Sequence, residues 1–310
     1  MLIAVTGGTG FVGGYVIQQL LRHEHQVRAL ALHPDRTGER SSRDNVELVR
    51  GTLEDRASLR QLTAGADAVI HLVGIIEEIG RQTFERVHVE GTRAVLAAAR
   101  EAGVRRFVYM SALGARPDPR ATPYHRTKAA AEELVRAEFA SHVIMKPSLI
   151  AAPGNEVVKM LLTMLRMSPL VPVIGNGLYR MQPIAAGDIA EAFAVAVEDE
   201  SIRGTFELGG PDMLTYHEML DLLEQALGVQ RRRMAVPVPM VRFSAYAGGV
   251  LPNLNPISPD QLQMLLEGST TTQNAVTSVF GIAPRPFSEV AREAAAPWAA
   301  LPAEGATVKA

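Results

Sequence analysis

A glycine-rich loop near the N-terminus constrains the fold of this chain most. The apolar run Leu2–Val5 leads directly into Thr6-Gly7-Gly8-Thr9-Gly10-Phe11-Val12-Gly13, where helical periodicity begins. Gly8, Gly10 and Gly13 satisfy the spacing G-x-G-x-x-G between a strand and a helix. There, glycines allow a tight turn, a close approach to a pyrophosphate and close helix–strand packing. The loop predicts a dinucleotide site at a helix N-terminus; the alternative is a structural turn on a degenerate Rossmann-like fold.

The first 150 residues alternate β-type runs with helical periodicity. The β-type runs are Leu2–Val5, Gln26–Leu30, Val46–Val49, Ala68–Leu72, Phe107–Met110 and Val143–Met145. The clearest helical segments are Phe11–Leu21, Thr83–Ala102 and Tyr124–Phe139. Such βαβ alternation predicts an α/β fold with a Rossmann-type, doubly wound parallel sheet.

After Pro153 the regular alternation of β-type and helical runs gives way to helical runs separated by loops that contain Pro and Gly. This change predicts a smaller, mostly helical C-terminal substrate lobe. We expect an NAD(P)-binding Rossmann domain at 1–153 and a cleft-framing and substrate lobe at 154–301, interleaved with the first domain around 181–199. A flexible tail follows at 302–310. The expected elements here are Val157–Leu165, Val171–Ile174, Ile189–Val197, Thr205–Leu208 and Tyr216–Leu227.

Composition excludes several classes of protein. The 310 residues carry 31 Lys and Arg against 33 Asp and Glu, and 47% are apolar, which argues against disorder and against a nucleic-acid partner. There is no cysteine, so thiol chemistry is excluded. The histidines lack metal-ligand spacing, so we expect no metal. No signal peptide and no apolar run of membrane-spanning length is present, so we expect a cytoplasmic protein without a transmembrane segment.

Three polar residues form a candidate catalytic set. Tyr124 and Lys128 are four residues apart in a predicted helix and share one face. An ammonium beside a phenol lowers the phenol's pKa, so Tyr124 could exchange a proton near neutral pH. Ser111 follows the strand Phe107–Met110 and could hold a substrate carbonyl. Taken alone, the same residues also fit a surface pair and a turn cap.

Together, these residues and several motifs resemble the short-chain dehydrogenase/reductase superfamily, in its extended and atypical branches. The set is most similar to bacterial relatives of the 39 kDa accessory subunit of respiratory complex I, with NmrA-like proteins next. The resemblance covers roughly residues 1–230. The further motifs that carry it are His71-Leu72-Val73-Gly74, Val87-His88-Val89-Glu90-Gly91-Thr92, Lys146-Pro147-Ser148, Gln182-Pro183, Gly187-Asp188-Ile189-Ala190 and Phe206-Glu207-Leu208-Gly209-Gly210-Pro211.

The resemblance implies a role for each matching residue. Tyr124 is the general acid/base, Lys128 lowers its pKa and bonds the nicotinamide ribose, and Ser111 orients the substrate oxygen. The sequence departs from the family at His88, Lys146 and Thr52, where the family has Asn, Arg and an acidic residue. The expected cofactor-binding residues are Gly7, Gly8, Thr9, Gly10, Phe11, Val12, Gly13, Leu32, His33, Arg36, Thr52, Leu53, Leu72, Val73, Gly74, His88, Tyr124, Lys128, Pro147, Ser148 and Leu149.

The segment after the second strand bears on the choice of nicotinamide. A carboxylate at the strand end favours NAD, and a nearby Arg accommodates the 2′-phosphate of NADP. The strand-end position holds the neutral Leu32, while His33 and Arg36 could meet a phosphate. NADP(H) is slightly favoured over NAD(H); a merely solvated loop is the alternative.

Two classes of function follow. The leading hypothesis is an NAD(P)-dependent oxidoreductase, or an epimerase or dehydratase using the same site, acting on a small carbonyl or hydroxyl substrate. The alternative is a non-catalytic NADP(H)-binding protein with a structural, assembly or redox-sensing role. The resemblance is compatible with a homodimer and with a peripheral partner role in a larger complex.

Two late segments fall outside these motifs. Arg231-Arg232-Arg233 could meet an anionic lipid or an acidic partner, or it could be an exposed loop or strand start. The apolar run Met240–Leu251 could form a partner-docking or membrane-surface helix, although closure of the substrate cleft is the favoured interpretation.

Overall fold

A computed structural model describes residues 1–33, 46–247 and 257–299 of the chain. It divides into two compact units. The first comprises Met1–Ser148, Ala186–Leu208 and Thr271–Ala283, and the second comprises Leu149–Ala185, Gly209–Thr270 and the chain from Pro284 onward. Within the described ranges, no helix is both long enough and apolar enough to cross a membrane.

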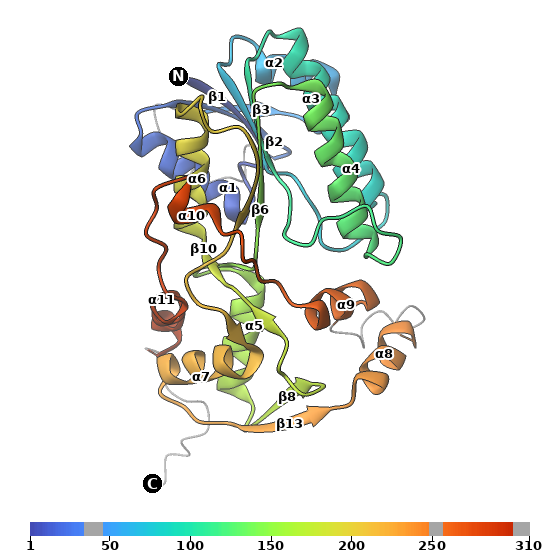
Figure 1. Ribbon diagram of the computed structural model, residues 1–310, viewed down its shortest axis with the longest axis vertical. Coiled ribbons are helices and arrows are strands. Elements are labelled where there is room, and N and C mark those ends of the chain that lie inside the picture. Colours follow the sequence, from blue (N-terminus) through green and yellow to red (C-terminus); the bar gives the residue numbers. More distant parts are fainter. Residues whose placement is uncertain (34–45, 248–256, 300–310) are drawn as a thin grey trace. The chain divides into compact units, whose positions relative to one another are not determined.

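A seven-stranded parallel sheet forms the centre of the first unit and confirms the predicted doubly wound fold (Figure 1). The strand order is β11-β6-β5-β4-β1-β2-β3, so successive connections run in opposite directions from the β1/β4 boundary. In such sheets, ligands bind outside the carboxyl ends of the strands at this boundary. The strands are β1 (Leu2–Thr6), β2 (Gln26–Ala31), β3 (Val46–Arg50), β4 (Ala68–His71), β5 (Arg106–Met110), β6 (His142–Pro147) and β11 (Gly204–Leu208).

Helices cover both faces of this sheet (Figure 1). Helices α1 (Phe11–Arg22) and α6 (Ala186–Glu198) lie on one face, and α2 (Arg56–Thr63), α3 (Gly91–Glu101) and α4 (Pro123–Glu138) lie on the other. The short α10 (Ala275–Ser278) also belongs to this unit. Because both faces are covered, the central strands are continuous apolar runs rather than alternating ones, and β4 is buried throughout.

Two elements of this unit differ from the sequence prediction. The expected single helix Thr83–Ala102 begins with a π-helical segment, η3 (Glu85–Glu90), before α3. The sequence predicts the strand Thr205–Leu208 as part of the C-terminal lobe at 154–301. Instead it pairs in parallel with β6 as the edge strand of the first unit's sheet.

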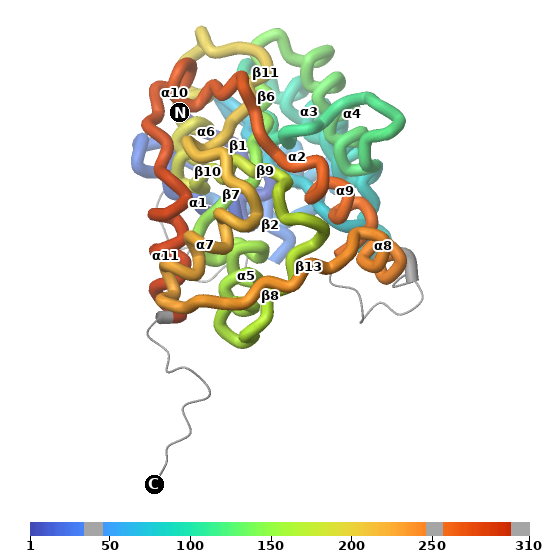
Figure 2. Tube along the Cα trace, turned by 60° about the horizontal axis from the view of Figure 1, so that its bottom comes forward, coloured from blue at the N-terminus to red at the C-terminus, as the bar shows by residue number. Residues whose placement is uncertain are grey.

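The second unit combines helices with three two-stranded ladders. β7 (Ile150–Ala151) pairs with β10 (Ile184–Ala185), β9 (Arg180–Met181) with β12 (Leu214–Thr215), and β8 (Leu170–Ile174) with β13 (Arg232–Val236). Its helices are α5 (Glu156–Met167), α7 (Tyr216–Leu227), α8 (Val238–Ala247), α9 (Pro259–Glu267) and α11 (Phe287–Ala299). Leucines of α5 and α7 pack with alanines of α11 to form its core. Figure 2 shows β8 and β13 side by side.

A buried arginine ties two distant segments of the first unit together. Arg106, at the start of β5, is 3% exposed and donates to the carbonyl oxygens of Ala196, Asp199 and Ile202. These carbonyls lie in the last turn of α6 and just beyond it, where helix carbonyls lack intrahelical partners. The guanidinium therefore satisfies the end of α6 and fixes it to the sheet.

We predict that Arg106→Leu lowers the free energy of unfolding by about 3 kcal/mol, because several buried carbonyl groups lose their donor. Urea denaturation would measure this loss. The matched control is Arg105→Leu, since Arg105 is the exposed neighbour of Arg106. Equal stability of the two variants would contradict the assignment.

Candidate active site

The glycine turn between β1 and α1 has the geometry of a phosphate-binding loop. Gly7 adopts a φ of +76°, and its carbonyl oxygen accepts the Gly10 N–H at 3.0 Å. A Cβ atom on Gly13 would lie 2.2 Å from the Gly7 oxygen, so only glycine fits at that position. The glycine that takes the left-handed conformation of this turn is therefore Gly7, which precedes the three glycines of the spacing motif. Gly8 instead packs against Ile17 and Ala29.

The surroundings of this turn fit a dinucleotide. Helix α1 begins at Phe11, and among the described residues no side chain caps its N-terminus. Its first N–H groups and its dipole are therefore available to an anionic pyrophosphate. A Cβ on Gly7 would also lie 3.1 Å from the Val73 nitrogen, so the turn packs directly against the strand-end residues Leu72 and Val73. The structure thus brings together the predicted residues Gly7–Gly13, Leu72 and Val73.

Lys128 occupies a buried position beside the carboxyl end of β5. It is 2% exposed, its Nζ donates to the Met110 carbonyl oxygen at 2.9 Å, and it lies 5.1 Å from the centre of the Tyr109 ring. A Cβ on Gly74 would approach Nζ to 2.9 Å, so the glycine at this position leaves room for the ammonium. Burial lowers the pKa of Lys128 to about 7, although the carboxylate of Glu132 acts in the opposite direction.

Tyr124 lies one helical turn before Lys128 on α4. Its ring, which is half-buried, packs edge-on against Phe84, His88 and His125. Burial raises the pKa of Tyr124 to about 12. The sequence predicts that Lys128 lowers the pKa of Tyr124 toward neutral pH. In the folded chain by itself, the pKa of Tyr124 is raised instead. Lys128, and not Tyr124, is the group whose pKa lies near neutrality.

His88 stands where the resembling family has an asparagine, and it makes two hydrogen bonds. Its Nε2 accepts the Ile75 N–H at 3.1 Å, so its Nδ1 carries the proton and donates to Thr127 Oγ1 at 2.9 Å. Burial lowers the pKa of His88 to about 3, which keeps the ring neutral. The side chain thus joins the loop after Gly74 to α4. The loop and the helix that carry Gly74, Tyr124 and Lys128 are held together by this residue.

Ser111 directly follows β5, as predicted, but its hydroxyl has a partner that sequence reasoning missed. Ser111 Oγ donates to Glu132 Oε1 at 2.5 Å, and both residues are 3% exposed. Arg136 and Lys146 also approach the Glu132 carboxylate, at 2.7 and 3.4 Å. The only sequence signal for Glu132 was its spacing, one turn after Lys128. Since Ser111 donates to Glu132, its oxygen lone pairs remain to accept a hydrogen bond.

The other predicted residues lie at nearby strand ends of the first unit, with two exceptions. Leu32 and His33 follow β2 and are exposed, as is Thr52 after β3, while Leu53 packs against Gly91. Pro147 ends β6, and the Ser148 N–H donates to the Leu208 oxygen at 2.8 Å. Leu149 belongs to the second unit, and Arg36 lies outside the described residues.

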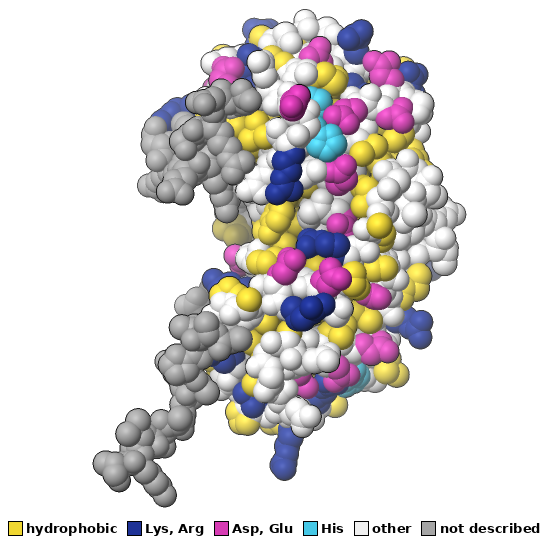
Figure 3. All heavy atoms as spheres, turned by 90° about the vertical axis from the view of Figure 1, so that its left-hand side faces the viewer, with side chains coloured by type: hydrophobic (Ala, Val, Ile, Leu, Met, Phe, Trp, Pro, Cys, Tyr) yellow, Lys and Arg dark blue, Asp and Glu magenta, His cyan; other side chains and the backbone are white. Residues whose placement is uncertain are grey.

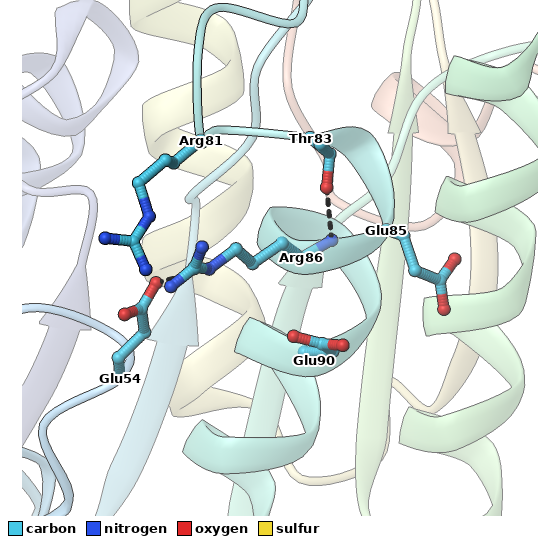
Figure 4. A pocket seen from close by; sticks show the side chains of 6 residues that line it. All are labelled: Glu54, Arg81, Thr83, Glu85, Arg86 and Glu90. Carbon is cyan, nitrogen blue, oxygen red and sulfur yellow. Dashed lines mark hydrogen bonds and ion pairs between the residues drawn. The ribbon is translucent and has the colours of Figure 1, made fainter.

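A pocket of about 540 Å³ that the sequence did not predict is lined in part by Glu54, the residue after Leu53 in the sequence (Figure 4). Arg86 forms an ion pair with Glu54 at 2.7 Å, and Figure 4 shows Arg81 directed toward the same carboxylate. Three glutamates and two arginines line the pocket, so its charges nearly cancel and do not favour a phosphate. Its lining residues are Glu54, Arg81, Thr83, Glu85, Arg86 and Glu90.

The buried lysine generates a prediction about stability. The folded chain holds Lys128 at a pKa of about 7, below its ordinary value of 10.5, so between these pH values the unfolded chain binds more protons. The free energy of unfolding therefore rises with pH across this window, by up to roughly 1.4 kcal/mol per pH unit from this group. We predict that Lys128→Met removes that rise and stabilises the protein at pH 7. Urea unfolding from pH 6 to 10 tests it. Lys159→Met, at an exposed lysine, is the control, and an unchanged pH slope in Lys128→Met would refute the prediction.

Comparison with known proteins shows which family the chain resembles. The family model described as "NAD dependent epimerase/dehydratase family" matches residues 3–209. NADH dehydrogenase (ubiquinone) 1 alpha subcomplex subunit 9, mitochondrial, of Arabidopsis thaliana is 29% identical over 295 residues, covering 89% of this chain and 72% of that protein. Ceramide reductase of Caulobacter vibrioides is 33% identical over 245 residues, covering 77% and 74%.

A solved structure gives the same fold. The crystal structure of the Thermus thermophilus UDP-glucose 4-epimerase in complex with NAD superimposes with a TM-score of 0.69, at 20% identity, and covers 95% of this chain and 97% of that one. With the family match over two thirds of the sequence, the conclusion is that the chain belongs to the NAD-dependent epimerase/dehydratase family, a family of nicotinamide-dependent oxidoreductases and epimerase-like enzymes.

Proposed function

We propose that this protein is an NAD(P)-dependent oxidoreductase of the short-chain dehydrogenase/reductase type, in which Tyr124 transfers a proton to or from the substrate oxygen. The observation that carries the proposal is the buried Lys128 ammonium, held by the Met110 carbonyl oxygen one turn after Tyr124. A buried lysine costs stability, and groups with such strongly shifted pKa values are concentrated at functional sites. The glycine turn of the same unit supplies the phosphate site.

The chain's residues divide the work as follows. Gly7–Gly13 and the α1 N-terminus bind the pyrophosphate, and Lys128 bonds the ribose. When bound, the nicotinamide supplies or accepts the hydride. Tyr124, whose pKa burial raises, is protonated at neutral pH and so is suited to donate a proton to a carbonyl oxygen. Ser111 donates to Glu132, and its oxygen can therefore accept a hydrogen bond from the hydroxyl of an alcohol substrate.

A second function rests on a separate observation. The similarity to a subunit of a mitochondrial NADH dehydrogenase supports a non-catalytic, NADP(H)-binding role in an assembly. The buried Ser111 favours catalysis, because its hydroxyl is assigned to the substrate and is not needed to hold a cofactor passively. We therefore place the catalytic proposal first.

We predict that Tyr124→Phe lowers kcat by roughly a hundredfold or more, because the proton donor is lost, while the cofactor Kd changes by no more than about threefold. Turnover would be followed through nicotinamide absorbance with a panel of carbonyl compounds. The similarity to a ceramide reductase adds ceramides to that panel. Tight cofactor binding without turnover of any substrate by the wild type would favour the non-catalytic role.

For the cofactor, we propose a preference for NADP(H), supported by the exposed, neutral Leu32 at the end of β2. Leu32→Asp would place a carboxylate at the position that distinguishes the two nicotinamides. We predict a shift in the ratio of NADPH to NADH affinity of about tenfold or more toward NADH, because the carboxylate repels a 2′-phosphate. Fluorescence titration of each cofactor measures it.

Leu178→Asp is the control for this substitution, because Leu178 is similarly exposed, at 60% against 56% for Leu32. A wild type that already prefers NADH would refute the preference. So would a Leu32→Asp variant that weakens both cofactors equally.

A further inference from the structure

Two long segments of the chain contain no acidic residue. The segments 157–187 and 225–259, of 31 and 35 residues, hold seven Lys and Arg and neither Asp nor Glu. At the chain's average of 33 acidic residues in 310, they would carry about seven. On the face shown in Figure 3, by contrast, acidic and basic side chains are interspersed. In the second unit, the two segments form most of α5, together with β8, β13 and α8.

The ladder of β8 and β13 has one apolar face in contact with solvent. Side chains alternate along a strand, and Val171 and Val173 of β8 point into the core. On the opposite face, Leu170 is 40% exposed, and it pairs in register with Arg232. Met234, paired with Pro172, is 46% exposed on the same face.

Helix α8 follows β13 directly after Pro237 and also exposes apolar side chains. Met240 and Phe243 are three residues apart, so they share one side of the helix, and they are 62% and 77% exposed. Leaving such large side chains in water forfeits the free energy that their burial would provide. We call the exposed residues Leu170, Pro172, Arg232, Met234, Met240, Arg242 and Phe243 the β13–α8 surface.

The basic residues of this region play two different roles. Arg231 donates to the Leu165 carbonyl oxygen, and Arg233 is ion-paired with Asp221, so both are engaged in the fold. Arg232, which begins β13, and Arg242 of α8 are exposed, and in the part of the chain that the structure describes neither is paired with a carboxylate. The Arg231–Arg233 run is thus a strand start with one side chain directed to solvent.

We propose that the β13–α8 surface binds an anionic membrane surface. Phe243, Met240 and Met234 would enter the boundary between headgroups and acyl chains, and Arg232 and Arg242 would contact lipid phosphates. Exposed apolar side chains together with basic residues are the two signals that hold a peripheral protein at a bilayer. The absence of any acidic residue from both segments lowers the repulsion that an anionic bilayer exerts on this part of the second unit, although α9, which contacts α8, carries Asp260 and Glu267.

The test is co-sedimentation of the full chain with phosphatidylcholine vesicles that contain or lack phosphatidylglycerol. We expect binding only to the anionic vesicles, and weaker binding at high salt. Each basic residue near such a surface contributes roughly a fivefold factor, so Arg232→Ala with Arg242→Ala should lower the partition coefficient about 25-fold. Met240→Ser with Phe243→Ser should lower it at least about tenfold at every salt concentration.

Two controls match these variants. Arg105→Ala removes an exposed charge of the first unit, and Met213→Ser removes a 43% exposed methionine of the second unit outside the surface. Both should bind like the wild type, and circular dichroism verifies that every variant is folded.

Three outcomes would overturn the proposal. The first is equal binding to vesicles with and without phosphatidylglycerol. The second is no vesicle binding together with a self-association that Met240→Ser/Phe243→Ser abolishes, which assigns the surface to a second copy of the chain. The third is no vesicle binding together with a changed KM in that variant, which assigns α8 to the substrate cleft. The vesicle-binding and self-association measurements do not depend on whether the proposed oxidoreductase activity is present, so failure of the membrane proposal can be told apart from failure of the proposed function.

Discussion

The candidate site of this protein depends on how the first unit holds one buried ammonium group. Removing the Lys128 charge from water costs several kcal/mol, and the fold offsets only part of that cost. The Met110 carbonyl oxygen accepts one hydrogen bond, the Tyr109 ring presents its face, and the Glu132 carboxylate adds a favourable field. Room for the ammonium exists because residue 74 is glycine. The buried Lys128 ammonium therefore limits which residue types fit in the loop after β4 and on the neighbouring part of α4.

The two histidines nearest to this lysine are neutral and add no further positive charge beside it. His88 and His71 are both buried, and burial together with the nearby lysine lowers the pKa of each to about 3. As neutral rings they connect elements by hydrogen bonds, His88 to Ile75 and Thr127, and His71 to Thr6 and Thr92. The substitution of histidine for the family's asparagine at residue 88 therefore keeps a neutral link between the loop and α4.

The parts of the site that sequence predicted are those that local patterns encode. Strand–turn–helix periodicity located the glycine turn, and spacing of four placed Tyr124 and Lys128 on one face of α4. Local patterns do not encode partners from distant segments. The contact between Ser111 and Glu132 joins residues 21 apart, and Glu132 in an Ala- and Glu-rich helix resembles a solvated position. Likewise, only pairing with β6 shows that the strand at Gly204–Leu208 belongs to the first unit's sheet.

The net charge of the whole chain also did not indicate a charged partner. It sums charges that lie too far apart in the folded protein to act together on one partner. The chain totals −2, which by itself indicates no charged partner. The two acid-free segments carry seven positive charges, and the rest of the chain therefore carries 24 basic against 33 acidic residues. Salt screens charges beyond roughly 8–10 Å, so a partner at the β13–α8 surface experiences the local excess and not the total. The same reasoning connects the charge to the exposed Phe243 and Met240: beside the basic side chains of the β13–α8 surface, apolar side chains can enter an anionic bilayer that an acidic surface would not approach.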